Sequence, residues 1–568
     1  MTAPRKPFNR TESNMTTNFL APALVSLLTL SGAVHAAAPA GVPPGSGDIL
    51  QQLKPVQPPM PAAANPGLQV QKDSGEPLPA SQPFAVRQVR IVGNTLFDTA
   101  TLHALVAAAE GRSITLQQLE DLARQITVHY QAKGYLVSQA IVPAQTIKDG
   151  IVTIQVVEAR LGKVVLDNQS RAATALLQAT LAPLQAGGAV EQTSIDHALL
   201  LISDISGLTI NAVLKPGEQA ATSDLVATVQ PRPFVSGNVS ADNLGNPVTG
   251  RARLGATVTV NTPLRLGDAL SLSVLSSGAD MAIGLLDYES VVTGTGTRVG
   301  AAVSTLRYKL GGDFKALGGH GTANTWSLRA KQPFARSRAF NLYGQIEADS
   351  LNLQDKVDSA GIQSARHVDT LSASVSGDSR DALGLSLWRL AVTGGQLRFS
   401  DTGAQQVDAV TTQTQGGFHK WNLSLTRLQA LSANTSALLN LSGQWTPANL
   451  DPSQKLSVGG AYNVRAYDMG SLSADQGYTV TVELQQRLSA AWQVQAFVDG
   501  ADVTINRKPW DSANANRASL YGAGLGLEWS NPEGWALKAS AAQRLGSLTP
   551  LLGSAARHRG WIQLSKAI

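Results

Sequence analysis

The chain has 568 residues, too many for one ordinary hydrophobic core, so its length predicts several domains unless a large barrel uses most of it. Cysteine is absent, which excludes a disulfide framework, a thiolate zinc site and a cysteine nucleophile. The net charge of +5 is small for this length and the basic residues are dispersed, so no nucleic-acid partner is expected.

The N-terminus has the order of an export signal. Three basic residues in the first ten positions precede the apolar run FLAPALVSLLTLSGAV at 19–34, and small residues follow it. This order predicts a secretory signal peptide over residues 1–36, cleaved after Ala36. A signal anchor fits less well because the run is short and contains a proline and a glycine. Met15 is an alternative start. No later apolar run is long enough for a spanning helix.

Residues 37–82 are rich in Pro, Ala and Gly, a composition that cannot bury a core and predicts an extended linker. Within this linker, residues 46–54 contain the stretch GDILQQLK, which could form two helical turns. Such a short helix is marginal in water on its own, so it needs a partner surface.

Residues 83–158 predict a small α+β unit. Thr115 and Gln118 form a capping-box pattern, and leucines then recur at helical spacing. The expected elements are a strand at 86–94, a helix at 99–109, a helix from 115, and strands at 136–143 and 150–161. Residues 159–231 repeat the order strand, helix, helix, strand, strand with little sequence identity, which predicts a second unit of similar size.

From residue 232 to 568 the periodicity changes to two. In RARLGATVTVN (251–261), polar or small residues alternate with Ala, Leu and Val, and about sixteen such segments follow one another without helices between them. Soluble sandwiches also alternate, so one such strand decides nothing. Many in succession behind a signal peptide predict a transmembrane β-barrel of about 16 antiparallel strands, preceded by the two α+β units.

Several phrases resemble the outer-membrane transporters of two-partner secretion, the family of the filamentous haemagglutinin transporter and the haemolysin activators. In the first unit, GNTLF, YQAKGY, VPAQTIKDG and VVEARLGKV resemble the family's first polypeptide-transport-associated (POTRA) domain. At the start of the barrel, DNLGNPVTGRARLGATVTVNTPLRLGD (242–268) is similar to the family's DN-x-G, TG-x-x-R and GD pattern. The similarity runs through nearly all of the mature chain.

The resemblance gives a context to the stretch NVRAYDMG. In the family, the sixth extracellular loop folds back into the barrel with a VRGY or VRGF motif at its tip. Here the connection at about 447–477 carries Val464, Arg465, Ala466 and Tyr467. Alanine replaces glycine, a departure that matters if the position needs a positive φ or a close approach.

A buried arginine needs a carboxylate partner. In the strand QVQAFVDG, Asp499 lies on the same face as two glutamines, so it points into the barrel if the valines of the other face contact lipid. The same alternation in the preceding strand makes Glu483 point inward. We therefore expect Arg465 to pair with Asp499, with Glu483 as the second candidate, and to tether the loop inside the barrel. Guanidinium suits this role because its planar fork can bind a carboxylate through two bonds. The alternative is a static brace for the barrel.

The resemblance implies an outer-membrane pore of a Gram-negative bacterium, with both POTRA domains in the periplasm. It would translocate an unfolded, β-rich exoprotein, captured by strand addition, without ATP, metal or another cofactor. The helix at 46–54 would plug the resting pore through Ile49, Leu50 and Leu53. The residues that we expect to contact the exoprotein, against the alternative of ordinary solvated surface, are Gln117, Arg124, Gln139 and Gln145. Outer-membrane lipid and the barrel-assembly machinery are the other expected partners.

Three other classes are considered. A diffusion porin explains the barrel but gives no role to two periplasmic units. A barrel-assembly factor of the same superfamily commonly carries more than two such units. An enzyme has little support, because the eight histidines are scattered and no H-E-x-x-H, G-x-S-x-G or phosphate-binding loop occurs.

The sequence leaves the identity of the exported protein open. An adhesin, a cytolysin, a contact-dependent toxin and a haem-scavenging exoprotein are all compatible with a transporter of this kind.

Overall fold

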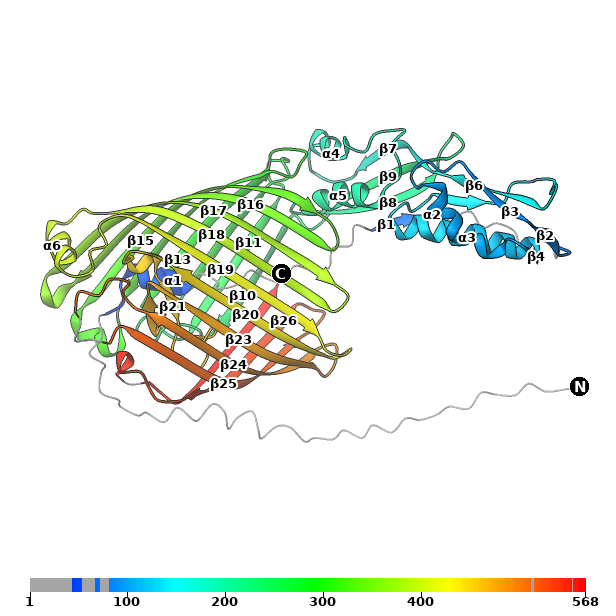
Figure 1. Ribbon diagram of the computed structural model, residues 1–568. Helices are drawn as coiled ribbons and strands as arrows, with labels where there is room; N and C mark the ends of the chain where they lie inside the picture. The colour runs from blue at the N-terminus through cyan, green and yellow to red at the C-terminus, as the bar shows by residue number, and fades with distance from the viewer. Residues whose placement is uncertain (1–42, 54–66, 72–80, 512–514, 554) are drawn as a thin grey trace, which may run out of the picture.

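The computed structural model describes residues 43–53, 67–71, 81–511, 515–553 and 555–568. The predicted signal peptide, residues 1–36, lies outside the described residues. The chain forms a large closed barrel, and two small α+β units project from one end of it (Figure 1). None of the helices in the described part is long and apolar enough to cross a membrane.

Sixteen antiparallel strands form the barrel, which confirms the predicted fold class and strand number. The first strand pairs with the last, so the sheet has no free edge. The strands are β10 (Val235–Asp242), β11 (Arg253–Asn261), β12 (Ala269–Ser276), β13 (Met281–Val291), β14 (Arg298–Lys309), β15 (Gly319–Arg336), β16 (Phe340–Val357), β17 (Ile362–Asp381), β18 (Gly384–Phe399), β19 (Gly416–Ala430), β20 (Thr435–Trp445), β23 (Gln476–Arg487), β24 (Trp492–Thr504), β25 (Arg517–Ser530), β26 (Trp535–Leu545) and β27 (His558–Ala567).

Besides the helix in the connection between β20 and β23, four short helices lie in the described connections between these strands: η2 (Gly312–Leu317), η3 (Asp358–Ala360), α6 (Thr402–Val410) and η5 (Pro550–Leu552). Helix α6 lies at the end of the barrel remote from the α+β units (Figure 1).

The outer wall is apolar and bounded by two rows of aromatic side chains, as in barrels that cross membranes. Leu254, Leu272 and Leu371 are among its exposed apolar residues. The row near the α+β units consists of Phe334, Phe340, Trp492 and Trp535, and the row near the far end consists of Trp326, Trp421, Trp445, Tyr478 and Tyr521. The hydrocarbon of the bilayer therefore lies between these two rows.

Polar residues of the first hairpin explain part of the sequence pattern that opens the barrel. Arg253 donates from Nε to Asp242 at 2.8 Å, and both side chains are buried on the inner face. Asp268 accepts bonds from the backbone N–H groups of Leu264 and Leu266, each at 3.0 Å, and so shapes the turn beneath the second α+β unit. The pattern residues thus hold the hairpin and its turn together.

The first α+β unit contains β2 to β6 and packs two helices and a short 3-10 turn on its strands. Its elements are β2 (Phe84–Val86), β3 (Gln88–Val92), α2 (Thr99–Ala104), η1 (Ala107–Ala109), β4 (Arg112–Ile114), α3 (Leu116–Ala132), β5 (Gln139–Ile141) and β6 (Ile151–Val157). The capping box predicted at Thr115 and Gln118 is present at the start of α3.

Glu158 joins three of the sequence phrases of this unit. Its carboxylate accepts the backbone N–H groups of Thr95 and Leu96, at 2.7 and 2.8 Å, and the hydroxyl of Tyr130 at 2.8 Å. Phe97 packs edge-on against the Tyr130 ring at 4.8 Å between centroids. Burial raises the pKa of Glu158, but these hydrogen bonds outweigh it and leave the pKa below its ordinary value.

The second α+β unit corrects the linker prediction. Its expected elements are present as β7 (Arg160–Asn168), α4 (Thr174–Leu181), α5 (Gln192–Ser203), β8 (Leu208–Pro216) and β9 (Thr222–Pro231). Its sheet also contains β1 (Leu68–Val70), which comes from the stretch predicted to be an extended linker and pairs in parallel with β8. Leu68 and Val70 pack against the core of the unit, so three linker residues do contribute to a folded domain.

We expect Glu158→Gln to destabilise the first α+β unit by about 2 kcal/mol, because it removes a charge that accepts four hydrogen bonds, the fourth from the hydroxyl of Thr95. Amide hydrogen exchange of the full chain would measure this as faster exchange around residues 95–97, with Glu120→Gln on α3 as the control. A folded-state pKa below the unfolded value of about 4.3 means that this stabilisation is complete above that pH and is lost as the pH falls through the folded pKa. Unchanged exchange in Glu158→Gln at pH 7 would contradict the assignment.

Candidate functional site

Two segments occupy the lumen of the barrel. One is the connection between β20 and β23, which contains η4 (Pro452–Gln454), β21 (Leu456–Val458) and β22 (Leu472–Ala474). The other is helix α1 (Ser46–Leu53), and both appear within the barrel wall in Figure 1. The connection therefore folds inward instead of extending away from the barrel.

Arg465 lies at the inner end of this connection and binds two carboxylates. Its Nε and Nη2 atoms donate to the two oxygens of Asp499 at 2.9 and 2.8 Å, and Nη1 donates to Glu483 at 2.9 Å. The backbone N–H of Arg465 also donates to Asp499, at 3.0 Å. The guanidinium lies over the ring of Phe497, 3.2 Å from its centroid. The structure thus brings the motif residue Arg465 together with the two carboxylates, Asp499 and Glu483, that strand alternation predicted to point inward.

The opposite wall also holds the loop. Trp561 on β27 donates its indole N–H to the carbonyl oxygen of Arg465 at 2.8 Å. Asp468 accepts a hydrogen bond from Arg251 at 2.7 Å and forms a second ion pair with Arg559. The tip of the loop therefore bridges strands β23 and β24 to the last strand and to the first hairpin.

Ala466, which stands where the family has glycine, fits because another residue leaves room for it. Its φ is not in the positive range, so the backbone at this position does not require glycine. A Cβ built on Gly522 of β25 would lie only 2.5 Å from the methyl group of Ala466. The close approach expected at the motif is thus present, and Gly522 provides the space. Val464 and Tyr467 are buried on either side.

Helix α1 covers an apolar patch on the inner wall. Ile49 and Leu50 are 1% and 7% exposed, and Leu53 is partly buried against the same cluster. Leucine is unusual on the inner face of a membrane barrel, where water normally requires polar residues. The apolar lumen patch, as we call it, consists of Leu306, Tyr308, Leu351, Leu353, Val368, Leu397 and Phe418.

Polar contacts fix the two ends of α1. The backbone N–H of Ser46 donates to Asp355 at 2.8 Å, and Gln52 accepts a hydrogen bond from Asn246 at 3.1 Å. A Cβ on Gly47 would lie 2.6 Å from the backbone nitrogen of Ser453 in η4. The helix and the inward loop are therefore in direct contact, and each limits the movement of the other.

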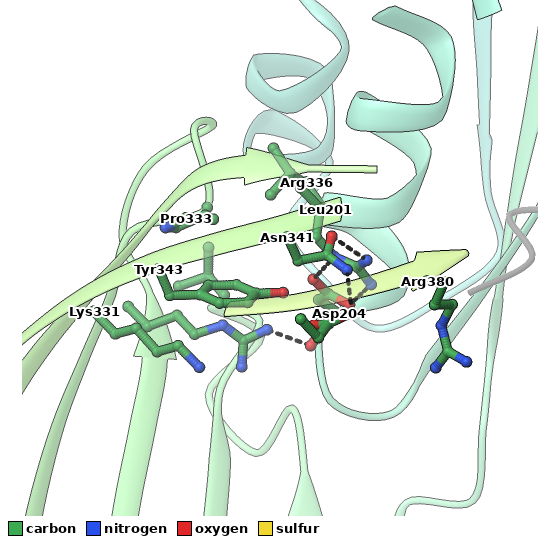
Figure 2. Close-up of a pocket in the computed structure, with 12 residues that line it drawn as sticks. Leu201, Asp204, Lys331, Pro333, Arg336, Asn341, Tyr343 and Arg380 are labelled. Carbon is green, nitrogen blue, oxygen red and sulfur yellow. Dashed lines mark hydrogen bonds and ion pairs between the residues drawn. The ribbon is translucent and has the colours of Figure 1, made fainter. Parts of the chain in front are cut away.

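The second α+β unit is joined to the mouth of the barrel by ion pairs. Arg336 on β15 donates two bonds to Asp204, both 2.7 Å, just after the end of α5, and Arg338 pairs with Asp196 at 2.7 Å. Figure 2 shows Arg336 and Asp204 at a polar cavity of about 290 Å³, lined also by Lys331. The cavity belongs to the entrance of the lumen from the side of the α+β units.

The four residues predicted to contact an exoprotein differ in their surroundings. Gln117, Arg124 and Gln139 are exposed on α3 and β5. Gln145 instead holds strand β6, because it donates to the carbonyl oxygen of Thr153 at 2.8 Å and accepts from its N–H at 2.7 Å. Three of the four are therefore free to meet a partner, whereas Gln145 already serves the fold.

Sequence reasoning did not identify several residues of the site. The apolar lumen patch could have been found from inward positions that carry leucine where polar residues are expected. Nothing in the sequence distinguishes Trp561 of the last strand as a partner of the loop. Arg366, which pairs with Asp451 at 2.8 Å and with Asp355, had no sequence signal that distinguished it. In the described part of the chain, no cluster of three or more His, Cys, Asp or Glu residues is placed to hold a metal ion.

Comparisons with known proteins agree with this arrangement. A family model described as haemolysin secretion/activation protein ShlB/FhaC/HecB matches residues 221–529, and a model of the ShlB-type POTRA domain matches residues 84–159. The chain is 27% identical over 496 residues to the heme/hemopexin transporter protein HuxB of Haemophilus influenzae (strain ATCC 51907), covering 85% of this chain and 87% of HuxB. It is 23% identical over 473 residues to the outer membrane transporter CdiB of Dickeya dadantii (strain 3937), covering 78% and 80%.

Solved structures show the same fold. CdiB from Escherichia coli has a TM-score of 0.65 at 20% identity, with 89% of this chain and 94% of that chain covered. BamA from Haemophilus ducreyi lacking POTRA domains 1–3 has a TM-score of 0.52 at 15% identity, with 85% and 100% covered. The barrel fold is thus shared with BamA, and the matching family model is that of secretion proteins. The chain belongs to the haemolysin secretion/activation family, and it is an outer-membrane transporter of two-partner secretion with its POTRA domains in the periplasm.

Proposed function

We propose that this transporter moves one large, unfolded, β-rich exoprotein through a lumen that helix α1 and the inward loop close at rest. The observation that supports this is the contact of both segments with the barrel wall and with each other. A diffusion porin would gain nothing from a helix that fills its lumen. Neither a nucleotide nor a metal is needed in this scheme, because folding of the exoprotein outside would bias its movement outward.

Capture of the exoprotein is assigned to the first POTRA domain. Gln117 and Arg124 are seven residues apart on α3, so they share one face of the helix. Gln139 lies on β5, the outer strand of its sheet, and the N–H of Ala140 donates to Thr127 of α3 at 2.9 Å. A polar helix face beside a short outer strand is suited to an extended chain that adds main-chain hydrogen bonds.

The assigned role of Arg465 is to hold the inward loop in a position that allows transport. Without the guanidinium, the carboxylate of Asp499 or Glu483 would be an unpaired charge in a confined, partly dehydrated part of the lumen. The loop contacts α1 through η4, so loosening of the loop would also loosen the helix.

The other proposed partners act on the barrel wall. Outer-membrane lipid surrounds the wall, and the barrel-assembly machinery inserts the barrel into the membrane.

The exoprotein itself is proposed to be encoded next to the transporter. The relatives do not identify it, since HuxB is named a heme/hemopexin transporter protein and CdiB an outer membrane transporter. Co-expression of the transporter with a neighbouring large exported protein tests the function. We expect that protein in the medium only when the transporter is present, and its equal release without the transporter would refute the proposal.

Removal of the plug should open the pore. Single-channel conductance in planar bilayers would compare the intact mature chain with a variant lacking residues 46–54. We expect a mostly closed channel to become steadily open. Gly47→Leu should act in the same direction, because its side chain would meet the backbone of Ser453, whereas Gly560→Ala, where a Cβ has open space, should leave the channel closed. If the intact chain and the deletion variant show equal, steadily open conductance, helix α1 does not close the resting pore.

The packing of Ala466 on Gly522 gives a test of loop docking that changes no charge. Gly522→Ala should displace the loop, because the two methyl groups would lie 2.5 Å apart, and secretion should fall several-fold. Adding Ala466→Gly should restore secretion by removing one of the methyl groups. If the single variant secretes normally, or if the second substitution gives no rescue, docking at this contact is not required.

Asp499→Asn tests the ion pair directly. The amide keeps the shape of the carboxylate but loses its charge, so Arg465 would retain one charged partner, Glu483. We expect secretion to fall about tenfold or more while the folded barrel still resists unfolding in detergent on gel electrophoresis. A loss of barrel stability equal to the loss of secretion would instead favour the static brace.

A further inference from the structure

The outer wall carries a groove at the far end of the barrel, away from the POTRA domains. Its volume is about 570 Å³, and strands β11 to β14 form it. The floor consists of small residues, including Ala256, Ala282 and Gly284, and the sides of larger ones such as Leu254 and Val274. A Cβ added to Gly284 would meet no atom within 4 Å, so the space is open. No acidic residue lines this groove.

The groove faces the membrane and not the lumen. Leu254 is 70% exposed and Val274 is 49% exposed, although both are apolar. On β14 the alternate residues Leu306 and Tyr308 are buried against the plug, so Arg307 between them points outward. Since successive side chains of a strand point to opposite faces, Leu254, Val274 and Arg307 belong to the lipid-facing surface, whereas Leu275 and Ile283 of the same lining pack toward the lumen.

A cation closes the outer end of this apolar space. Arg307 lines the groove, and Lys309 follows two residues further along the same outward face. Neither side chain has a hydrogen bond or ion pair with any residue in the described part of the chain. Lys356 on β16 is exposed on the same side, two strands from Lys309 and thus about 10 Å away.

The height of these cations corresponds to the headgroups of the outer leaflet. Trp326, in the far aromatic row, pairs with Val303, and Arg307 is four residues beyond that pair. Four residues of a strand tilted by about 45° rise about 9 Å above the aromatic row. Aromatic rows mark the boundary of the hydrocarbon, so Arg307 and Lys309 lie among phosphate groups, and the groove extends from Arg307 toward the acyl chains.

We propose that this groove binds one lipid A molecule of the outer leaflet, with an acyl chain on Gly284 and its phosphates on Arg307 and Lys309. The inference rests on the outer-membrane location of the barrel, and it is independent of the exoprotein and of the plug. An apolar slot directly beneath unpaired cations matches a lipid that carries several acyl chains and phosphate. A zwitterionic or single-phosphate lipid would satisfy this pair of cations less well.

Native mass spectrometry of the full, delipidated chain in detergent tests the proposal, with diphosphoryl lipid A as the probe. We expect one tightly bound molecule. Arg307→Ala with Lys309→Ala should weaken its binding by about tenfold or more, because each cation near the headgroups contributes separately. Arg517→Ala is the matched control, since Arg517 lies at the same end of the barrel but already pairs with Asp502 at 2.9 Å.

Gly284→Leu tests the groove without altering charge. The leucine side chain should fill the open space and displace the acyl chain, with a loss of binding of about tenfold, whereas Gly394→Leu, also in open space on β18, should bind as the parent does. Equal binding by the parent, the charge variant and Gly284→Leu overturns the proposal. So does phosphatidylglycerol binding as tightly as lipid A, or displacement of lipid A by millimolar inorganic phosphate. Secretion assays on the same variants separate this site from the transport function.

Discussion

The arrangement of the lumen depends on one buried guanidinium. Arg465 comes from a loop that enters the barrel from its far end, and a charge in this place is stable only when carboxylates meet it. Asp499 and Glu483 satisfy it from two adjacent strands, and Trp561 holds the backbone from the other wall. The loop is thus fixed at its tip on both sides, and its base presents η4 to helix α1. The position of helix α1 therefore depends on an ion pair that the helix does not itself contact.

Helix α1 and the apolar lumen patch on the inner wall stabilise each other. The apolar lumen patch would be costly in contact with water, and an eight-residue helix would be marginal alone, yet each buries the apolar face of the other. Opening of the pore must therefore expose the patch or cover it with something else. An extended β-rich chain carries apolar residues on one face, so the chain in transit is a natural replacement for the helix. In the proposed scheme, the resting closure and the passage of the exoprotein then use the same surface.

The sequence predicted the barrel, its strand number and the order of elements in the α+β units, because alternation and helical spacing are local signals. Inward parity also selected Asp499 and Glu483, since the valines between inward positions fix the outward face. Other features depend on register between distant strands. Gly522 accommodates Ala466 from 56 residues away, and only the paired sheet reveals it. Strand β1 was missed because three residues within a Pro-rich stretch show no periodicity. Its strand conformation depends on pairing with β8, which the sequence does not reveal.

Strand β1 also changes what departure of the plug means. Residues 54–67 join α1 to β1, and fourteen residues reach at most about 50 Å. While β1 stays on the second POTRA domain, a released helix remains beside the entrance at an effective concentration on the order of millimolar. Return to the lumen is then a unimolecular step that is independent of protein abundance. In the proposed scheme, the exoprotein competes with this tethered helix throughout its passage, and the pore recloses promptly behind the last residue exported.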